Sequence, residues 1–91
     1  MSITIAGTTF DNSEYDARGD VLYLSVGPPR EAARTLATEE GHAIDYDETG
    51  AVIGMVLMNV RWMLEREGAI TLTWPAERLE ADQLQTMLSA A

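Results

Sequence analysis

The sequence contains no cysteine and no lysine, and each absence excludes a class of function. Without cysteine there is no disulfide framework, no thiolate metal site and no thiol nucleophile. Because lysine is absent, six arginines are outnumbered by fifteen acidic residues, which gives a net charge of −9. Binding to nucleic acid or to an anionic membrane needs clustered basic side chains, so this balance argues against both.

Long apolar runs are also absent. No stretch approaches the roughly 20 apolar residues that span a bilayer. Residues 1–5 lack the basic start and apolar run of a secretory signal, so we expect a cytoplasmic protein. A chain of 91 residues suffices for one hydrophobic core and is too short for two, which predicts a single α+β domain over residues 1–91. A second subunit is a common way for such a small chain to bury more area.

What is present is a series of short strands separated by turn residues. Residues 3–10 predict a hairpin that turns at Ala6-Gly7, and residues 21–26 predict a central strand. The clearest hairpin covers residues 42–58 and contains a tight turn followed by a return strand, in which Gly54 predicts a bulge or a close backbone approach. The mixed charge and alanine of residues 30–41 predict a surface loop with at most one helical turn.

Two segments carry helix signals. Asn59 suits an N-cap and Gly68 suits the position after a helix end, which predicts a short helix at about residues 60–67; a direct hairpin turning at Gly68 is the alternative. After a strand at residues 69–74, a pattern like a capping box at Asp82 opens a C-terminal helix. The expected fold is α+β, a small antiparallel meander of hairpins with a C-terminal helix.

Two motifs in these strands are similar to those of a known family. YDARGDVLYLSV (15–26) and IDYDETGAVIG (44–54) resemble a small bacterial family catalogued as domain of unknown function twenty-two eighty-three. Where that family often has Ile-Glu after the last glycine, this chain has Met55-Val56. The resemblance covers roughly residues 10–60 and implies a fold type and no activity. Some members of the family lie beside small toxin-like proteins, which suggests an antitoxin role by association.

The residues offer little for catalysis. His42 is the only imidazole and no serine lies in a nucleophile motif, so we expect neither enzymatic activity nor a cofactor. Acidic residues gather around two turns, where a carboxylate-based metal site or hydrolase is an alternative. Aspartate side chains commonly accept bonds from turn N–H groups, which favours structural roles for Asp16, Asp20 and Asp47, with Gly50 supplying the positive φ of its turn.

We therefore interpret the chain as a non-enzymatic protein-interaction or oligomerisation domain. The strand at residues 52–58 is apolar on both faces and few helices are expected to cover it. This predicts a homodimer with Met55, Leu57, Trp62 and Trp74 near its interface. The acidic composition makes a basic protein the expected foreign partner, and an antitoxin-like inhibitor of a small basic toxin is an alternative function.

Overall fold

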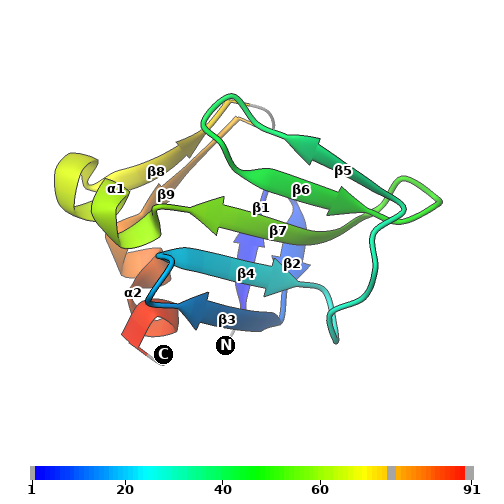
Figure 1. The fold of residues 1–91 in the computed structure, drawn as a ribbon, viewed down its shortest axis with the longest axis horizontal. Coiled ribbons are helices and arrows are strands. Elements are labelled where there is room, and N and C mark those ends of the chain that lie inside the picture. Colours follow the sequence, from blue (N-terminus) through cyan, green and yellow to red (C-terminus); the bar gives the residue numbers. More distant parts are fainter. Residues whose placement is uncertain (1, 74–75, 90–91) are drawn as a thin grey trace.

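A computed structural model describes residues 2–73 and 76–89 of the chain (Figure 1). Its centre is a five-stranded antiparallel sheet of order β3-β4-β7-β6-β5, and two further hairpins are formed by β1 with β2 and by β8 with β9. The elements are β1 (Ile3–Ile5), β2 (Thr8–Phe10), β3 (Asn12–Asp16), β4 (Val21–Ser25), β5 (Arg34–Ala37), β6 (Ala43–Tyr46), β7 (Val52–Met58), α1 (Val60–Glu67), β8 (Ala69–Leu72), β9 (Glu77–Glu80) and α2 (Ala81–Ser89). The predicted α+β class is confirmed.

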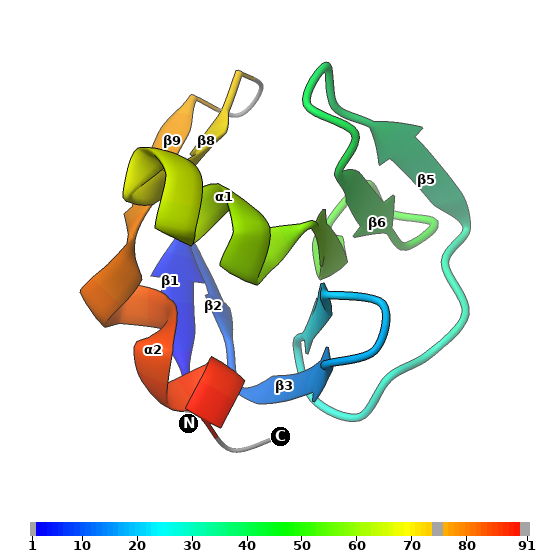
Figure 2. The same ribbon diagram turned by 60° about the vertical axis from the view of Figure 1, so that its left-hand side comes forward.

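The five-stranded sheet has one covered face and one bare face. The two hairpins and α2 lie behind it in Figure 1, and Figure 2 shows α1 crossing between the two layers at one end. Period-2 alternation directs one set of side chains from each strand into the space between the layers. The largest side chains buried there include Ile5, Phe10, Leu22, Leu57, Val60, Ile70, Leu79 and Leu84. The other side of the sheet is called the outer face below.

Local backbone chemistry explains the turns that were predicted. Ala6 and Gly7 have φ values of 50° and 85°, the two positive values that a tight two-residue hairpin turn requires. Gly50 has a φ of 87° in the turn between β6 and β7. Gly68 has a φ of 78° and its N–H donates to the carbonyl of Leu64 at 2.9 Å, which ends α1. The helix, rather than the alternative hairpin, is therefore the structure of residues 60–67.

Gly54 shows both features predicted for it. The register of β6 against β7 shifts beside Asp45, so the glycine lies next to a bulge. A Cβ atom built on Gly54 would lie 3.2 Å from the Leu24 carbonyl oxygen and 3.2 Å from Oδ2 of Asp45. A Cβ at position 54 would therefore be in tight contact with the backbone of β4, which would have to shift by a few tenths of an ångström.

Residues 30–41 are not simply a loop, because residues 34–37 form the edge strand β5. All four of its residues are exposed, so it has no apolar alternation to identify it. Backbone pairing with β6 holds it instead, and next to the strand the N–H of Thr38 donates to the His42 carbonyl at 2.8 Å. The Arg34 guanidinium also lies 5.3 Å from the centre of the Tyr46 ring.

The C-terminal elements follow their predicted pattern in part. Ile70 and Leu72 of β8 are buried as expected, and Trp74 lies outside the described residues. In α2 the buried side chains are those at helical spacing, including Leu84. Asp82 lies inside the helix rather than before it, so it is not the predicted N-cap.

Candidate interaction surface

The outer face of the sheet has an apolar centre. Strand register places Tyr23 opposite Val56, and Val56 opposite Ala43, so these three side chains form a row across β4, β7 and β6. The neighbouring row pairs Val21 with Met58. Tyr23 is 46% exposed and Met58 is 37% exposed, although both belong to central strands. No described helix or strand covers the row of Tyr23 and Val56 (Figures 1 and 2), whereas Val21 in the neighbouring row is only 7% exposed.

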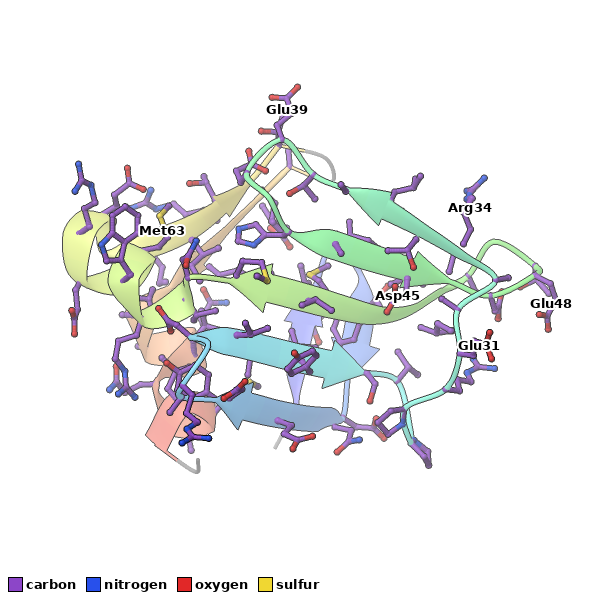
Figure 3. All side chains as sticks on the ribbon, viewed as in Figure 1. Glu31, Arg34, Glu39, Asp45, Glu48 and Met63 are labelled. Carbon is purple, nitrogen blue, oxygen red and sulfur yellow. The ribbon has the colours of Figure 1, made fainter. Side chains whose placement is uncertain are left out.

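Polar groups border the apolar centre on one side. A third row contains Asn12, Ser25, Gly54 and Asp45, and these four residues line part of a hollow of about 280 Å³. The amide of Asn12 donates to Ser25 Oγ at 3.2 Å, and Asp45 accepts a 2.6 Å hydrogen bond from the hydroxyl of Thr35. Figure 3 looks onto this face and labels Asp45. The border is therefore hydrogen-bonded and carries the negative charge of Asp45, while the hollow is also lined by Arg30 from the segment before β5.

Asp20 joins the sheet to α1. Its carboxylate accepts hydrogen bonds from the N–H groups of Arg61 at 2.8 Å and Trp62 at 3.0 Å, and from the hydroxyl of Tyr15 at 2.6 Å. Burial opposes ionisation, but these three donors hold the pKa of Asp20 below its usual value. The carboxylate caps the N-terminus of α1 from a distant turn, while the expected cap, Asn59, makes no side-chain capping bond.

Two further turn aspartates accept bonds from nearby N–H groups. Asp16 Oδ1 receives the N–H of Arg18 at 3.1 Å. Asp47 Oδ1 receives the N–H of Ala51 at 3.0 Å, and the N–H and hydroxyl of Thr49 at 2.9 and 2.6 Å. The hydroxyl of Thr49 is the largest reason why the pKa of Asp47 lies below its usual value. These carboxylates are thus engaged by their own turns.

The single histidine is held inside the fold. His42 is only 2% exposed, and its Nδ1 accepts a hydrogen bond from the N–H of Met58 at 2.9 Å. Because Nδ1 is an acceptor, the ring proton is on Nε2, which has no partner among the described residues. Burial lowers the pKa of His42, against a smaller opposing effect of Glu40. The ring is neutral at physiological pH and fixes the start of β6 to the end of β7.

The structure corrects the predicted interface. Met55 is 2% exposed and Leu57 is fully buried, because both point from β7 into the core and not towards the outer face. Neither side chain is accessible to another protein in the folded chain. Trp62 is 53% exposed and remains available, with the Arg66 guanidinium 5.0 Å from its ring centre. Trp74 lies outside the described residues.

The residues at the centre of the outer face were not singled out from the sequence. Tyr23 and Val56 lie in strands whose two faces are both largely apolar, so alternation alone does not show which side is covered. Cross-strand register shows which residues share a face, because Leu24 pairs with Met55 on the core side and Tyr23 pairs with Val56 on the outer face. The capping role of Asp20 has no local signal either, since its partners lie about forty residues away.

Two absences apply to the described part of the chain. Within residues 2–73 and 76–89, no three acidic or imidazole side chains come together in a way that could hold a metal ion. None of the helices described is long and apolar enough to cross a membrane.

The structure thus defines an α+β protein whose antiparallel sheet is covered on one face by hairpins and a helix. The family model described as protein of unknown function (DUF2283) matches residues 12–61, which is more than half of the chain. The chain belongs to this family, as its two strand motifs indicated. No curated protein and no solved structure matches the chain.

Proposed function

We propose that the chain is a non-enzymatic protein-interaction domain that docks a partner protein on the outer face of its sheet. The observation that carries the proposal is the bare apolar row across the three central strands, where Tyr23 is 46% exposed and Val56 is half-buried. Exposed apolar patches rimmed by polar residues commonly mark interaction sites. A tyrosine at the centre also matches the residue types that dominate binding energy in protein interfaces.

Charge indicates the kind of partner. Glu14 lies beside Tyr23 in the central row, Asp16 lies in the row of Met58, and Asp45 borders the hollow. A second copy of a chain with net charge −9, docked face to face, would bring these acids against their own counterparts. A basic protein would instead meet complementary charge, so we propose a basic partner for this face.

The contacts of the polar side chains support a role without catalysis. The Nδ1 atom of His42 is engaged by a backbone N–H inside the fold, away from the outer face. The carboxylates of Asp16, Asp20 and Asp47 accept hydrogen bonds from backbone N–H groups. A general base and an activated nucleophile need polar groups that are free to meet a substrate.

The test replaces Tyr23 with a photoreactive benzoylphenylalanine and irradiates the protein in an extract of its source cells. The matched control carries the same group at Thr86, an exposed position on α2 behind the sheet. We expect position 23 alone to capture a protein of net positive charge. Capture should weaken in a Glu14→Arg background and as added salt shortens the Debye length below about 8 Å.

Three results would contradict the proposal. Position 23 could capture no more than position 86 does, the captured molecule could be nucleic acid or an acidic protein, or capture could be independent of salt. Each of these would show that the acidic, apolar outer face does not select a basic protein partner.

A further inference from the structure

Strand β5 is an open edge of the five-stranded sheet. It pairs with β6 on one side, and no described element runs along its other side (Figures 1 and 2). All four of its residues are exposed, including Leu36 at 42%. An exposed edge presents unpaired N–H and C=O groups and is a template for a further strand.

The register identifies which backbone groups are free. Thr38, just beyond the strand, donates its N–H to the carbonyl of His42, and Leu36 is opposite Ile44 in the same register. In antiparallel pairs the inward and outward backbone groups alternate, so the N–H and C=O groups of Thr35 and Ala37 point away from β6.

The opposite edge of the sheet carries acidic side chains that discourage strand pairing, and β5 carries none. Edge strand β3 contains the exposed acids Glu14 and Asp16. Strand β5 contains no acid and has one basic residue, Arg34, at its beginning. Proteins commonly use charged side chains, proline or bulges to protect sheet edges from pairing. Neither edge strand contains proline or a register shift, so the exposed acids of β3 are what distinguish it from β5.

We propose that β5 pairs with β5 of a second copy of this chain, antiparallel and symmetric about Leu36. In this arrangement Thr35 is opposite Ala37 of the second copy, and these residues exchange the free backbone hydrogen bonds. The two Leu36 side chains face each other as a non-hydrogen-bonded pair, where cross-strand side chains lie closest. The pairing joins two five-stranded sheets and places their outer faces side by side.

The strand is complementary to itself in both shape and charge. Leu36 points to the covered side of the sheet but is left half-exposed beside a hollow of about 190 Å³ lined by Ile44 and Tyr46. A second Leu36 would cover this apolar edge. Arg34 is the first residue of β5, and Glu39 lies two residues beyond the last residue of the strand, near its other end (Figure 3). Antiparallel pairing brings the basic end of one strand to the acidic end of the other, whereas parallel pairing would place Arg34 beside its own copy.

This inference concerns a different surface from the proposed partner site, and the two can fail separately. Changes at β5 should alter the mass of the free protein and leave photocapture at position 23 available to a single chain. Changes at Tyr23, on the outer face, should leave the mass of the free protein unchanged.

The absence of cysteine permits a direct test with single-cysteine variants. Leu36→Cys places two thiols across the symmetry axis, at a Cβ separation close to that of a disulfide. Thr35→Cys is the matched control, because it lies on the same strand but points to the other face and is opposite Ala37. Under mild oxidation we expect Leu36→Cys to form a covalent dimer at least about tenfold faster than Thr35→Cys. Equal rates, or a faster control, would overturn the proposed pairing.

A charge exchange tests the pairing in the unmodified cysteine-free chain. Light scattering over about 1 μM to about 1 mM should show a concentration-dependent rise to twice the mass of one chain, since short interfaces are weak. Arg34→Glu and Glu39→Arg should each reduce the dimer fraction, and the double variant should restore it. A mass of one chain at every concentration, or a dimer unaffected by both single changes, would refute the inference.

Discussion

Replacing Asp20 tests whether one carboxylate joins the sheet to α1. Asp20→Ala removes three acceptor contacts at once, to the N–H groups of Arg61 and Trp62 and to the hydroxyl of Tyr15. Loss of a helix cap typically costs about 0.5–2 kcal/mol of stability. Leaving the hydroxyl of the buried Tyr15 without a partner costs about 1–3 kcal/mol more.

The combined loss should be about 2–4 kcal/mol, because contacts to one shared carboxylate are not additive. This is a large part of the roughly 5–15 kcal/mol that stabilises a typical small domain. Asp20→Asn should cost about half as much, since asparagine keeps an acceptor and tolerates the φ of 57° at this position but removes the charge from the helix N-terminus.

Urea unfolding followed by circular dichroism measures these differences. Arg18→Ala is the matched control, an exposed position in the same turn, and should change stability by less than about 0.5 kcal/mol. Tyr15→Phe, combined with Asp20→Ala in a double-mutant cycle, isolates the hydroxyl contact. The loss should be the same with and without added calcium or magnesium.

Two outcomes would contradict the roles assigned to Asp20, which are the cap of α1 and the partner of the Tyr15 hydroxyl. One is an Asp20→Ala variant that is no less stable than Arg18→Ala. The other is a zero coupling energy between Tyr15 and Asp20, which would mean that the 2.6 Å contact contributes nothing.

Two further predictions concern His42 and Gly54. Because the folded pKa of His42 is lowered, the unfolded chain binds more protons below about pH 6.5, so stability should fall as pH drops from 7 towards 5, by at most about 1.4 kcal/mol per pH unit. His42→Asn keeps an acceptor for the Met58 N–H and should flatten this slope in urea titrations; an unchanged slope would exclude His42 as its source. Gly54→Ala should cost about 1–3 kcal/mol in the same assay, since its Cβ would meet the immobile Leu24 carbonyl. Gly19→Ala, whose Cβ would lie 3.2 Å from Oδ2 of the movable Asp16 side chain and 3.4 Å from Cγ2 of Val21, meets side chains rather than a carbonyl and should cost less; an equal loss would contradict this.

The sequence was sufficient for elements with strong local chemistry. The hairpins at residues 3–10 and 42–58 combine alternation with turn residues that accept positive φ, and both formed where expected. Strand β7 has the predicted bounds, and α1 lies between the predicted terminal residues. Local signals suffice in these segments because turn and cap residues act on their immediate neighbours.

Three strands without such signals were missed. Strand β5 is exposed throughout, β3 buries only Tyr15, and β9 buries only Leu79. Their strand conformation comes from backbone pairing with the strand directly before or after them in the chain, and not from their own side chains. The composition of residues 30–41 therefore predicted a loop, whereas backbone pairing with β6 makes residues 34–37 a strand.

The candidate surface was harder to predict than the fold because it depends on register. The strand at residues 21–26 was correctly predicted to be central, yet Met55 and Leu57 of the strand at residues 52–58 were assigned to an interface, whereas both lie in the core. Sequence alternation separates the two faces of a strand but does not show which face is buried. The buried face is determined by the hairpins and α2, which pack against one side of the sheet.

The family match covers the five-stranded sheet but not the segments that pack behind it. Residues 12–61 contain all five strands of the sheet and end at Arg61, whose N–H is capped by Asp20. The β1–β2 and β8–β9 hairpins and α2, which bury the inner face, all lie outside the match. In this chain the inner face is therefore occupied by segments that the family pattern does not specify. A contact that this chain makes through residues 12–61 has to use what the other segments leave accessible, which is the outer face and the two sheet edges. Of these edges, β3 carries acids and β5 does not.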